Sequence, residues 1–330
     1  MADSIKTVWD SVGHTPLIRI QSLSDSTGCE ILAKAEFLNP GGSIKDRAAK
    51  GIIEAAEKEG KLKVGDTLVE GTAGNTGIGL ATLAAERGYR VIVSMPDNQS
   101  NEKYEALRAL GVEVRAVPPV PFSNPNHFYH RAKQISESEN IFWANQFENT
   151  ANSDFHFKTT GPEVWEQTGG QVDVLVLAAG TGGTIGGVSR FLKAKRPQLH
   201  VVLADPHGSG LFCFLREGKM ETSGSSITEG IGIMRVTANF KTALIDEAIR
   251  ISDQEMLEML NHVARKDGLL IGTSSALNLR AAFEFAKAHR GQGLRIVTVI
   301  CDSATRYQSR VFNSDWLRDK GLNPMKTLDI

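Results

Sequence analysis

The 330-residue chain is poor in cysteine, with only Cys29, Cys213 and Cys301, which lie far apart. An odd and widely spaced set argues against a disulfide framework and against a zinc site, because both require cysteines at characteristic spacings. We therefore expect no metal site and a reducing, cytoplasmic compartment. The N-terminal segment MADSIKTVWDSVG carries acidic residues and no apolar stretch, so we do not expect a signal peptide.

The chain also lacks an excess of charge and any long hydrophobic run. Its formal net charge is -1, which leaves no electrostatic footprint for nucleic acid or for an anionic membrane. No apolar run approaches the length of a transmembrane helix. Hydrophobic residues make up 41% and charged residues 23%, as is ordinary for a globular protein. We expect small-molecule partners, with no nucleic acid and no membrane.

The sequence does contain alternating strand and helix patterns, which favour α/β layers built on parallel sheets. The length is sufficient for two domains. Strands are expected at 30–37, 67–70, 90–96, 112–117, 141–145, 172–180, 200–206 and 295–302, and helices at 44–59, before Gly88, at about 101–110 and 127–138, up to about 196, and at 252–267 and 275–289. Residues 206–240 are irregular, and a loop of that length is more often functional than incidental.

Lys45 occupies an unusual place in the sequence. Ser43 is expected to cap a helix, with Asp46 completing a capping-box-like pair. Lys45 would then lie in the first turn, where the helix dipole disfavours a cation. That position favours the neutral amine, which is a nucleophile that forms Schiff bases. The alternative is a surface lysine that tolerates a poor position.

The segment Gly180-Thr-Gly-Gly-Thr184 follows a strong strand and opens a helix. Successive backbone N–H groups at a helix N-terminus bind anions, so Gly180, Thr181, Gly182, Gly183 and Thr184 predict a phosphate site. The alternative is a tight turn that needs glycine for packing. A P-loop is excluded because no lysine is present, and the dinucleotide fingerprint has Ile185 where it needs glycine. Asp205, at the end of the next strand, keeps a nicotinamide-dependent dehydrogenase as a remote alternative.

Two further loops join a strand to a helix. In Gly71–Gly77, the hydroxyls of Thr72 and Thr76 can bind a carboxylate, and Asn75 can bond a hydroxyl or phenolate oxygen. In Gly272–Asn278, a serine hydroxyl can bond a ring nitrogen without a full charge. The alternatives are an Asn-capped turn and an ordinary serine N-cap.

Three isolated residues carry weaker signals. Gln146 lies just after a strand end, where it can touch a substrate, although a lone Gln is usually a solvated loop residue. His156 is expected to pack or to form hydrogen bonds rather than to act as a base. Cys301 ends a buried strand and is expected in the core.

Taken together, these segments resemble the cysteine synthase (O-acetylserine sulfhydrylase) family of fold-type II pyridoxal-phosphate enzymes. The resemblance covers nearly the whole chain and rests on seven motifs in family order. They are Val12-Gly-His-Thr-Pro-Leu17, Asn39-Pro-Gly-Gly-Ser-Ile-Lys-Asp-Arg47, Gly74-Asn-Thr-Gly-Ile-Gly-Leu-Ala81, Gln146-Phe-Glu-Asn149, Thr159-Thr-Gly-Pro-Glu163, Gly180–Thr184 and Gly272–Ser275.

The resemblance implies an architecture and a set of roles. It implies two three-layer α/β domains like those of tryptophan synthase β: a smaller, mobile one at 41–150 and a larger, cofactor-binding one formed by 1–40 plus 151–330. It also implies a homodimer. Pyridoxal 5'-phosphate would be held by Lys45, Asn75, Gly180 to Thr184 and Ser274, and the substrate carboxylate by Thr72, Asn75, Thr76 and Gln146.

The reaction implied by the resemblance is a β-replacement. O-acetyl-L-serine, or a related O-acylated serine, would lose its acyl group to leave an aminoacrylate, and sulfide would add to form L-cysteine. Lys45 would anchor the cofactor and shuttle the proton.

The chain departs from the family at four places, all of which we expect near the substrate or its entrance. They are Ala73 for Ser, Ala276 for Gly, Thr150 for Pro, and the segment Glu229–Arg235, which keeps only the start of a family loop. These departures leave open a cysteine desulfhydrase that forms pyruvate, ammonia and sulfide. A silent binding protein on the same scaffold is a further alternative.

Overall fold

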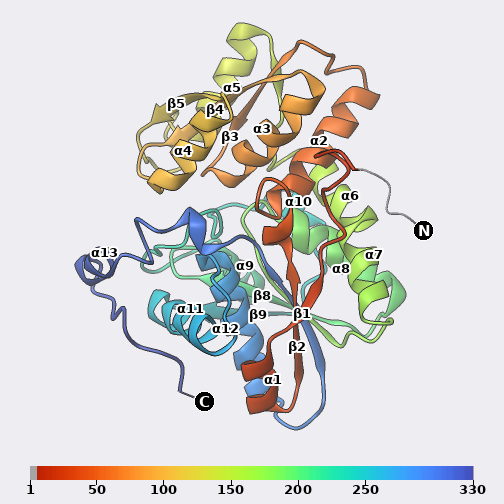
Figure 1. The fold of residues 1–330 in the computed structure, drawn as a ribbon, viewed down its shortest axis with the longest axis vertical. Coiled ribbons are helices and arrows are strands. Elements are labelled where there is room, and N and C mark those ends of the chain that lie inside the picture. The colour runs from red at the N-terminus through yellow and green to blue at the C-terminus, as the bar shows by residue number, and fades with distance from the viewer. Residues whose placement is uncertain (1–5, 330) are drawn as a thin grey trace.

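Two separate β-sheets organise the chain in the computed structural model, which describes residues 6–329 (Figure 1). Residues 1–5, part of the segment judged above not to be a signal peptide, and Ile330 lie outside the described residues. The larger sheet has the order β1-β2-β10-β7-β8-β9 and the smaller one β5-β4-β3-β6. No helix within residues 6–329 is both long enough and apolar enough to cross a membrane.

The strands of the larger sheet are β1 (Leu17–Arg19), β2 (Glu30–Ala35), β7 (Val174–Ala178), β8 (His200–Pro206), β9 (Glu247–Ile251) and β10 (Arg295–Ile300), and those of the smaller sheet are β3 (Thr67–Gly71), β4 (Arg90–Pro96), β5 (Glu113–Val117) and β6 (Phe142–Trp143). The helices are α1 (Gln21–Thr27), α2 (Lys45–Lys58), α3 (Asn75–Arg87), α4 (Asn101–Ala109), α5 (Phe128–Glu139), α6 (Ala151–Lys158), α7 (Thr160–Gln167), α8 (Gly183–Lys195), α9 (Leu211–Glu217), α10 (Ala238–Lys241), α11 (Asp253–Lys266), α12 (Thr273–Ala288) and α13 (Ser314–Asp319). Single 3₁₀ turns span Glu36–Leu38 and Ala304–Arg306.

The larger sheet is buried on both faces. All its strand pairs are parallel except β1 with β2. Val174 and Val176 of β7 pack in one apolar cluster with α11 and α12, while Leu175 and Leu177 pack in another with α8. This alternation follows from the two-residue period of a strand, and it explains why such strands read as unbroken apolar runs.

The smaller sheet is entirely parallel and has the same layered arrangement. Val91 and Val93 of β4 pack with α2, α3 and α4, whereas Ile92 packs with α5 on the other face. Figure 1 shows β3, β4 and β5 with these helices above the larger sheet. Helix α2 also packs against α6, so it contacts both parts of the molecule.

The structure contains every strand expected from the sequence, and the α/β class with mainly parallel sheets is confirmed. The expected strand at 141–145 is only two residues long. Helix α9 lies inside the segment 206–240, which was expected to be irregular throughout. The short strands β1 and β9 had no predicted counterpart. The division at residues 40/41 and 150/151 stays a prediction, although β3 to β6 all fall within 41–150.

Close packing of α8 on α6 depends on glycine. A Cβ placed on Gly187 would lie 2.2 Å from the Ser153 carbonyl oxygen and 2.6 Å from the Cβ of His156. We therefore expect Gly187→Ala to lower the free energy of unfolding by about 1–3 kcal/mol, although alanine is the better helix former. Urea unfolding followed by circular dichroism measures this change. Lys195→Ala, at an exposed position of the same helix, is the control, and an equal loss in both variants would contradict the packing argument.

Candidate active site

A cavity of about 410 Å³ lies where the carboxyl ends of strands from both sheets meet. Its walls include every residue that the sequence predicted for the site. These are Lys45, Thr72, Asn75, Thr76, Gln146, Gly180, Thr181, Gly182, Gly183, Thr184 and Ser274. Segments separated by more than two hundred residues therefore converge on one space, as is typical of parallel α/β folds. The individual roles of these residues stay predictions.

Lys45 is the first residue of α2 and is half-buried in the cavity wall. Its predicted place in the first turn agrees with the structure, but the predicted capping is wrong. Ile44 is the N-cap residue, and the Ser43 hydroxyl accepts the Lys45 N–H at 3.2 Å. The Asp46 carboxylate accepts the N–H of Gly41 at 2.5 Å instead of turning back to Ser43. The physical reason is that Ser43 forms an isolated antiparallel bridge with Asp302, so the helix can begin only after it.

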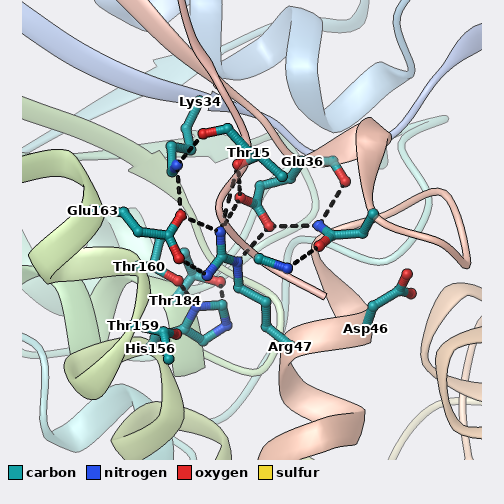
Figure 2. Close-up of polar contacts among 12 residues, drawn as sticks. Thr15, Lys34, Glu36, Asp46, Arg47, His156, Thr159, Thr160, Glu163 and Thr184 are labelled. Atoms are coloured by element: carbon teal, nitrogen blue, oxygen red, sulfur yellow. Dashed lines mark hydrogen bonds and ion pairs between the residues drawn. The ribbon is translucent and has the colours of Figure 1, made fainter. Parts of the chain in front are cut away.

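A buried ion cluster fixes the start of α2, two residues beyond Lys45 (Figure 2). The Arg47 guanidinium donates two hydrogen bonds to Glu36, at 2.7 and 2.8 Å, and two to Glu163, both at 2.7 Å. Lys34 pairs with Glu163 at 2.6 Å. Bidentate pairs of this kind are strong and directional. They tie α2 to the 3₁₀ turn after β2 and to α7, and they hold Lys45 at the cavity wall.

The charges in this cluster stabilise one another. Burial alone would raise the pKa of Glu163, but hydrogen bonds and charge from Arg47 lower it to about 2. Burial likewise opposes ionisation of Glu36, and the charge of Arg47 outweighs it, so the pKa of Glu36 lies below its usual value. Both carboxylates are therefore ionised near neutral pH. An ionised pair inside a protein requires such mutual compensation, since a single buried charge is costly.

The segment 180–184 forms a cradle for an anion. Gly182 has a left-handed backbone, with φ of 82°, and α8 begins at Gly183 without a side-chain cap. A Cβ on Gly180 would lie 2.2 Å from the Gly230 carbonyl oxygen, so only glycine fits there. The first-turn N–H groups and the helix dipole together suit a phosphate.

His156 lies beside this cradle and contacts its last residue, Thr184. Its ring nitrogens lie 2.8 Å from the Thr160 hydroxyl and 3.3 Å from the Thr184 hydroxyl (Figure 2). Burial, together with the nearby Arg47, lowers the pKa of His156 to about 3, so the imidazole is neutral. The prediction that His156 forms hydrogen bonds is confirmed.

Asn75 and Ser274 lie on cavity walls contributed by different helices. Asn75 opens α3 and donates its side-chain N–H to the Asp302 carboxylate at 2.7 Å, while its side-chain oxygen has no partner among the described residues. Ser274 lies in the first turn of α12, whose N-cap is Gly272, so an ordinary serine cap is not its role. Cys301 is half-buried and packs against the core, as expected, and it also lines the same cavity. It comes one residue after the end of β10, where a strand opens onto the site.

Gln146 is buried and braced within the protein. Its side-chain N–H groups donate to Glu70 at 3.2 Å and to the Gly71 carbonyl at 3.1 Å, and its oxygen accepts the Thr76 hydroxyl at 2.5 Å. Burial raises the pKa of Glu70 to about 8. The carboxyl that holds Gln146 is thus mostly neutral at pH 7. The hydrogen bond between Gln146 and Thr76 fixes the orientation of both side chains. Because Gln146 is buried, the alternative of a solvated loop residue is wrong.

The outer part of the cavity is aromatic and was missed by sequence reasoning. Phe122 and Tyr129 line it, and Arg235 stacks on both rings at 4.3 and 4.4 Å while pairing with Glu148 at 2.6 Å. Arg235 comes from the irregular segment 206–240, which supports the expectation that this loop is functional. Phe122 lies in the proline-rich run 118–126, which directly follows the end of β5 at Val117. A loop at the carboxyl end of a strand was the sequence feature that could have indicated this part of the cavity wall.

The departures from the family pattern are not all at the cavity. Ala73 and the whole of 229–235 line it. Ala276 is instead a residue of α12 that faces the core, and Thr150 is an exposed residue before α6, so neither lies in the cavity wall as expected. Asp205 is fully buried and accepts the Phe212 N–H at 2.9 Å, and it is not among the residues that line the cavity, so it has no ribose to bind there. The dehydrogenase alternative is therefore wrong.

The donor set fits pyridoxal phosphate. An amine, an uncapped helix N-terminus built on glycine, the Asn75 amide and a neutral hydroxyl surround one cavity. The sequence matches the family model described as pyridoxal-phosphate dependent enzyme over residues 8–302. The chain belongs to this pyridoxal-phosphate dependent family. Its members use pyridoxal phosphate, and Lys45, Asn75, Ser274 and the cradle are the residues that would hold it here.

The chain is also similar to individual enzymes, both in sequence and in structure. The chain is similar to cysteine synthase 1 of Emericella nidulans, with 49% identity over 95% of this chain and 86% of that protein. It is similar in structure to an O-acetylserine dependent cystathionine beta-synthase from Helicobacter pylori, with TM-score 0.85, 33% identity, and coverage of 93% and 98%. A hydrogen sulfide-producing enzyme from Fusobacterium nucleatum gives TM-score 0.84, 32% identity, and coverage of 92% and 99%.

Removal of the Arg47 charge should destabilise the protein strongly. Arg47→Met leaves Glu36 without a cation and Glu163 with Lys34 alone, and we expect a loss of about 3–5 kcal/mol in the free energy of unfolding. Urea unfolding of the cofactor-free protein measures it. Arg108→Met, which breaks an exposed pair with Glu105, is the matched control and should change little. Equal stabilities of the two variants would overturn the role given to the cluster.

Proposed function

We propose that this chain is a cysteine synthase, which forms L-cysteine from O-acetyl-L-serine, or a related O-acylated serine, and sulfide. The observation that carries the proposal is the convergence of Lys45 and the cradle 180–184 on one cavity. The cysteine synthase of Emericella nidulans, 49% identical, supports the choice of reaction.

The cavity residues have different roles in the proposed reaction. The cofactor supplies the electron sink that makes the substrate α-proton acidic, and the protein supplies binding, orientation and proton transfer. The cradle would hold the phosphate, and the Lys45 amine would anchor the cofactor and move the α-proton. Ser274 would offer a neutral hydroxyl to the ring nitrogen. Thr72, Asn75 and the Thr76–Gln146 pair form the wall that receives the substrate carboxylate.

A cysteine desulfhydrase is the second candidate. It is favoured by the structural similarity to a hydrogen sulfide-producing enzyme and by Ala73, which places a methyl group where the family usually has a hydroxyl at the cavity. Both reactions begin with loss of the same α-proton and differ in whether sulfide enters or leaves. The two therefore share Lys45, the cradle and the substrate wall.

Absorption spectra of the purified enzyme with pyridoxal phosphate test the proposal. O-acetylserine should shift the visible band, and sulfide should then restore it with release of cysteine. Faster release of sulfide and pyruvate from added cysteine would replace the synthase by the desulfhydrase. A bound cofactor whose band no substrate alters would indicate a silent binding protein.

Lys45→Ala is the control, and we expect it to abolish turnover in either direction together with the borohydride-sensitive band. Normal turnover by this variant would overturn the assignment of the cofactor anchor.

We also propose a cytoplasmic homodimer, on the basis of the family resemblance. Light scattering of the purified protein should then give about twice the chain mass of 35.8 kDa. A mass of one chain would exclude the dimer.

A further inference from the structure

Asp302 is a fully buried carboxylate that lies two residues after the end of β10. It does not line the cavity itself, but it forms a hydrogen bond with a residue that does. Its side chain accepts the Asn75 N–H and the Tyr307 O–H, both at 2.7 Å. Burial and the neighbouring Asp302 charge raise the pKa of Tyr307 well above its usual value, so the phenol stays a donor. One carboxylate oxygen thus receives two hydrogen bonds, one of them from a cavity residue.

The backbone of Asp302 contacts the other two segments that would hold the cofactor. It pairs with Ser43, two residues before Lys45, in an antiparallel bridge. Its carbonyl oxygen accepts the Gly272 N–H at 3.1 Å and the Ser275 O–H at 3.4 Å, on either side of Ser274. The residue therefore joins the starts of α2, α3 and α12.

Position 272 is shaped around this carboxylate. A Cβ on Gly272 would lie 2.0 Å from the Oδ1 atom of Asp302 and 2.5 Å from the Tyr307 ring. Asp302 consequently occupies space that any larger residue at 272 would take. Close packing of this kind leaves the carboxylate little freedom to turn away from Asn75.

We infer that Asp302 is a positioning residue that fixes the orientation of the Asn75 amide. A carboxylate oxygen only accepts hydrogen bonds, so it selects the nitrogen side of the amide and excludes the reversed orientation. The amide nitrogen carries a second hydrogen, which remains available to the ring oxygen of pyridoxal phosphate. The inference deepens the proposed function and rests on its placement of the cofactor near Asn75.

The consequence concerns the protonation of the cofactor ring oxygen. An N–H donor favours the anionic oxygen, whereas the carbonyl of a reversed amide would favour the neutral hydroxyl. These two forms of lysine-bound pyridoxal phosphate absorb in the visible and in the near-ultraviolet, respectively. Their ratio therefore reports the orientation of Asn75 directly, without turnover.

The test compares Asp302→Ala, Asp302→Asn and the parent enzyme, each reconstituted with pyridoxal phosphate. Asp302→Ala frees the amide, so we expect the near-ultraviolet fraction to rise at least threefold and the dissociation constant of the cofactor to rise five- to twentyfold. Asp302→Asn keeps a carbonyl oxygen that can accept from Asn75, and we expect both values to return to within about twofold of the parent. Absorption and fluorescence titrations give both quantities.

Asp205→Ala is the matched control, because Asp205 is also a fully buried aspartate at a strand end of the larger sheet but does not line the cavity. It should leave the ratio of the two bands unchanged even if it lowers stability. If Asp302→Ala keeps the parent ratio, or if Asp205→Ala changes it equally, the inference is wrong. If Asp302→Ala does not fold, Asp302→Asn decides by itself, since a ratio changed more than threefold would contradict the rescue. A parent enzyme that binds no pyridoxal phosphate would overturn the cofactor placement instead.

Discussion

The double ion pair of Arg47 with Glu36 and Glu163 is the interaction on which the site depends. It joins the start of α2 to the 3₁₀ turn that directly follows β2 and to α7, and all three side chains are buried. Lys45 lies half a helical turn before it, so the position of the amine follows from the position of the guanidinium. The buried ion pairs of Arg47 therefore fix the direction in which the Lys45 side chain enters the cavity.

The parts of the site that could be predicted are local in sequence. The cradle at 180–184 needs only a strand, three glycines and a helix in succession, and each of these is visible within a few residues. The partners of Arg47 could not be found in this way, since Glu163 lies 116 residues away. The capping of α2 failed for the same reason: the bridge from Ser43 to Asp302 is a tertiary contact that overrides a local preference.

The elements of the fold that could be predicted were also those with a clear local sequence pattern. The buried strands of both sheets were predictable because parallel strands covered on two faces are apolar throughout. The short strands β1 and β9 escaped notice because they lie at the edges of the larger sheet, with only three and five residues to show a pattern. The positions expected for Ala276 and Thr150 were wrong because a motif gives the order of residues along the chain but not the direction that each side chain faces.

The neutral ring of His156 has a consequence for the cradle. A neutral imidazole carries a single N–H, so it donates to only one of Thr160 and Thr184 and accepts from the other. Phosphate oxygens accept hydrogen bonds, and the Thr184 hydroxyl has one hydrogen to give. For that hydrogen to reach a phosphate, the N–H must lie on Nε2, and Thr160 must donate to Nδ1. An anion in the cradle would thus select the tautomer of a ring that it does not touch.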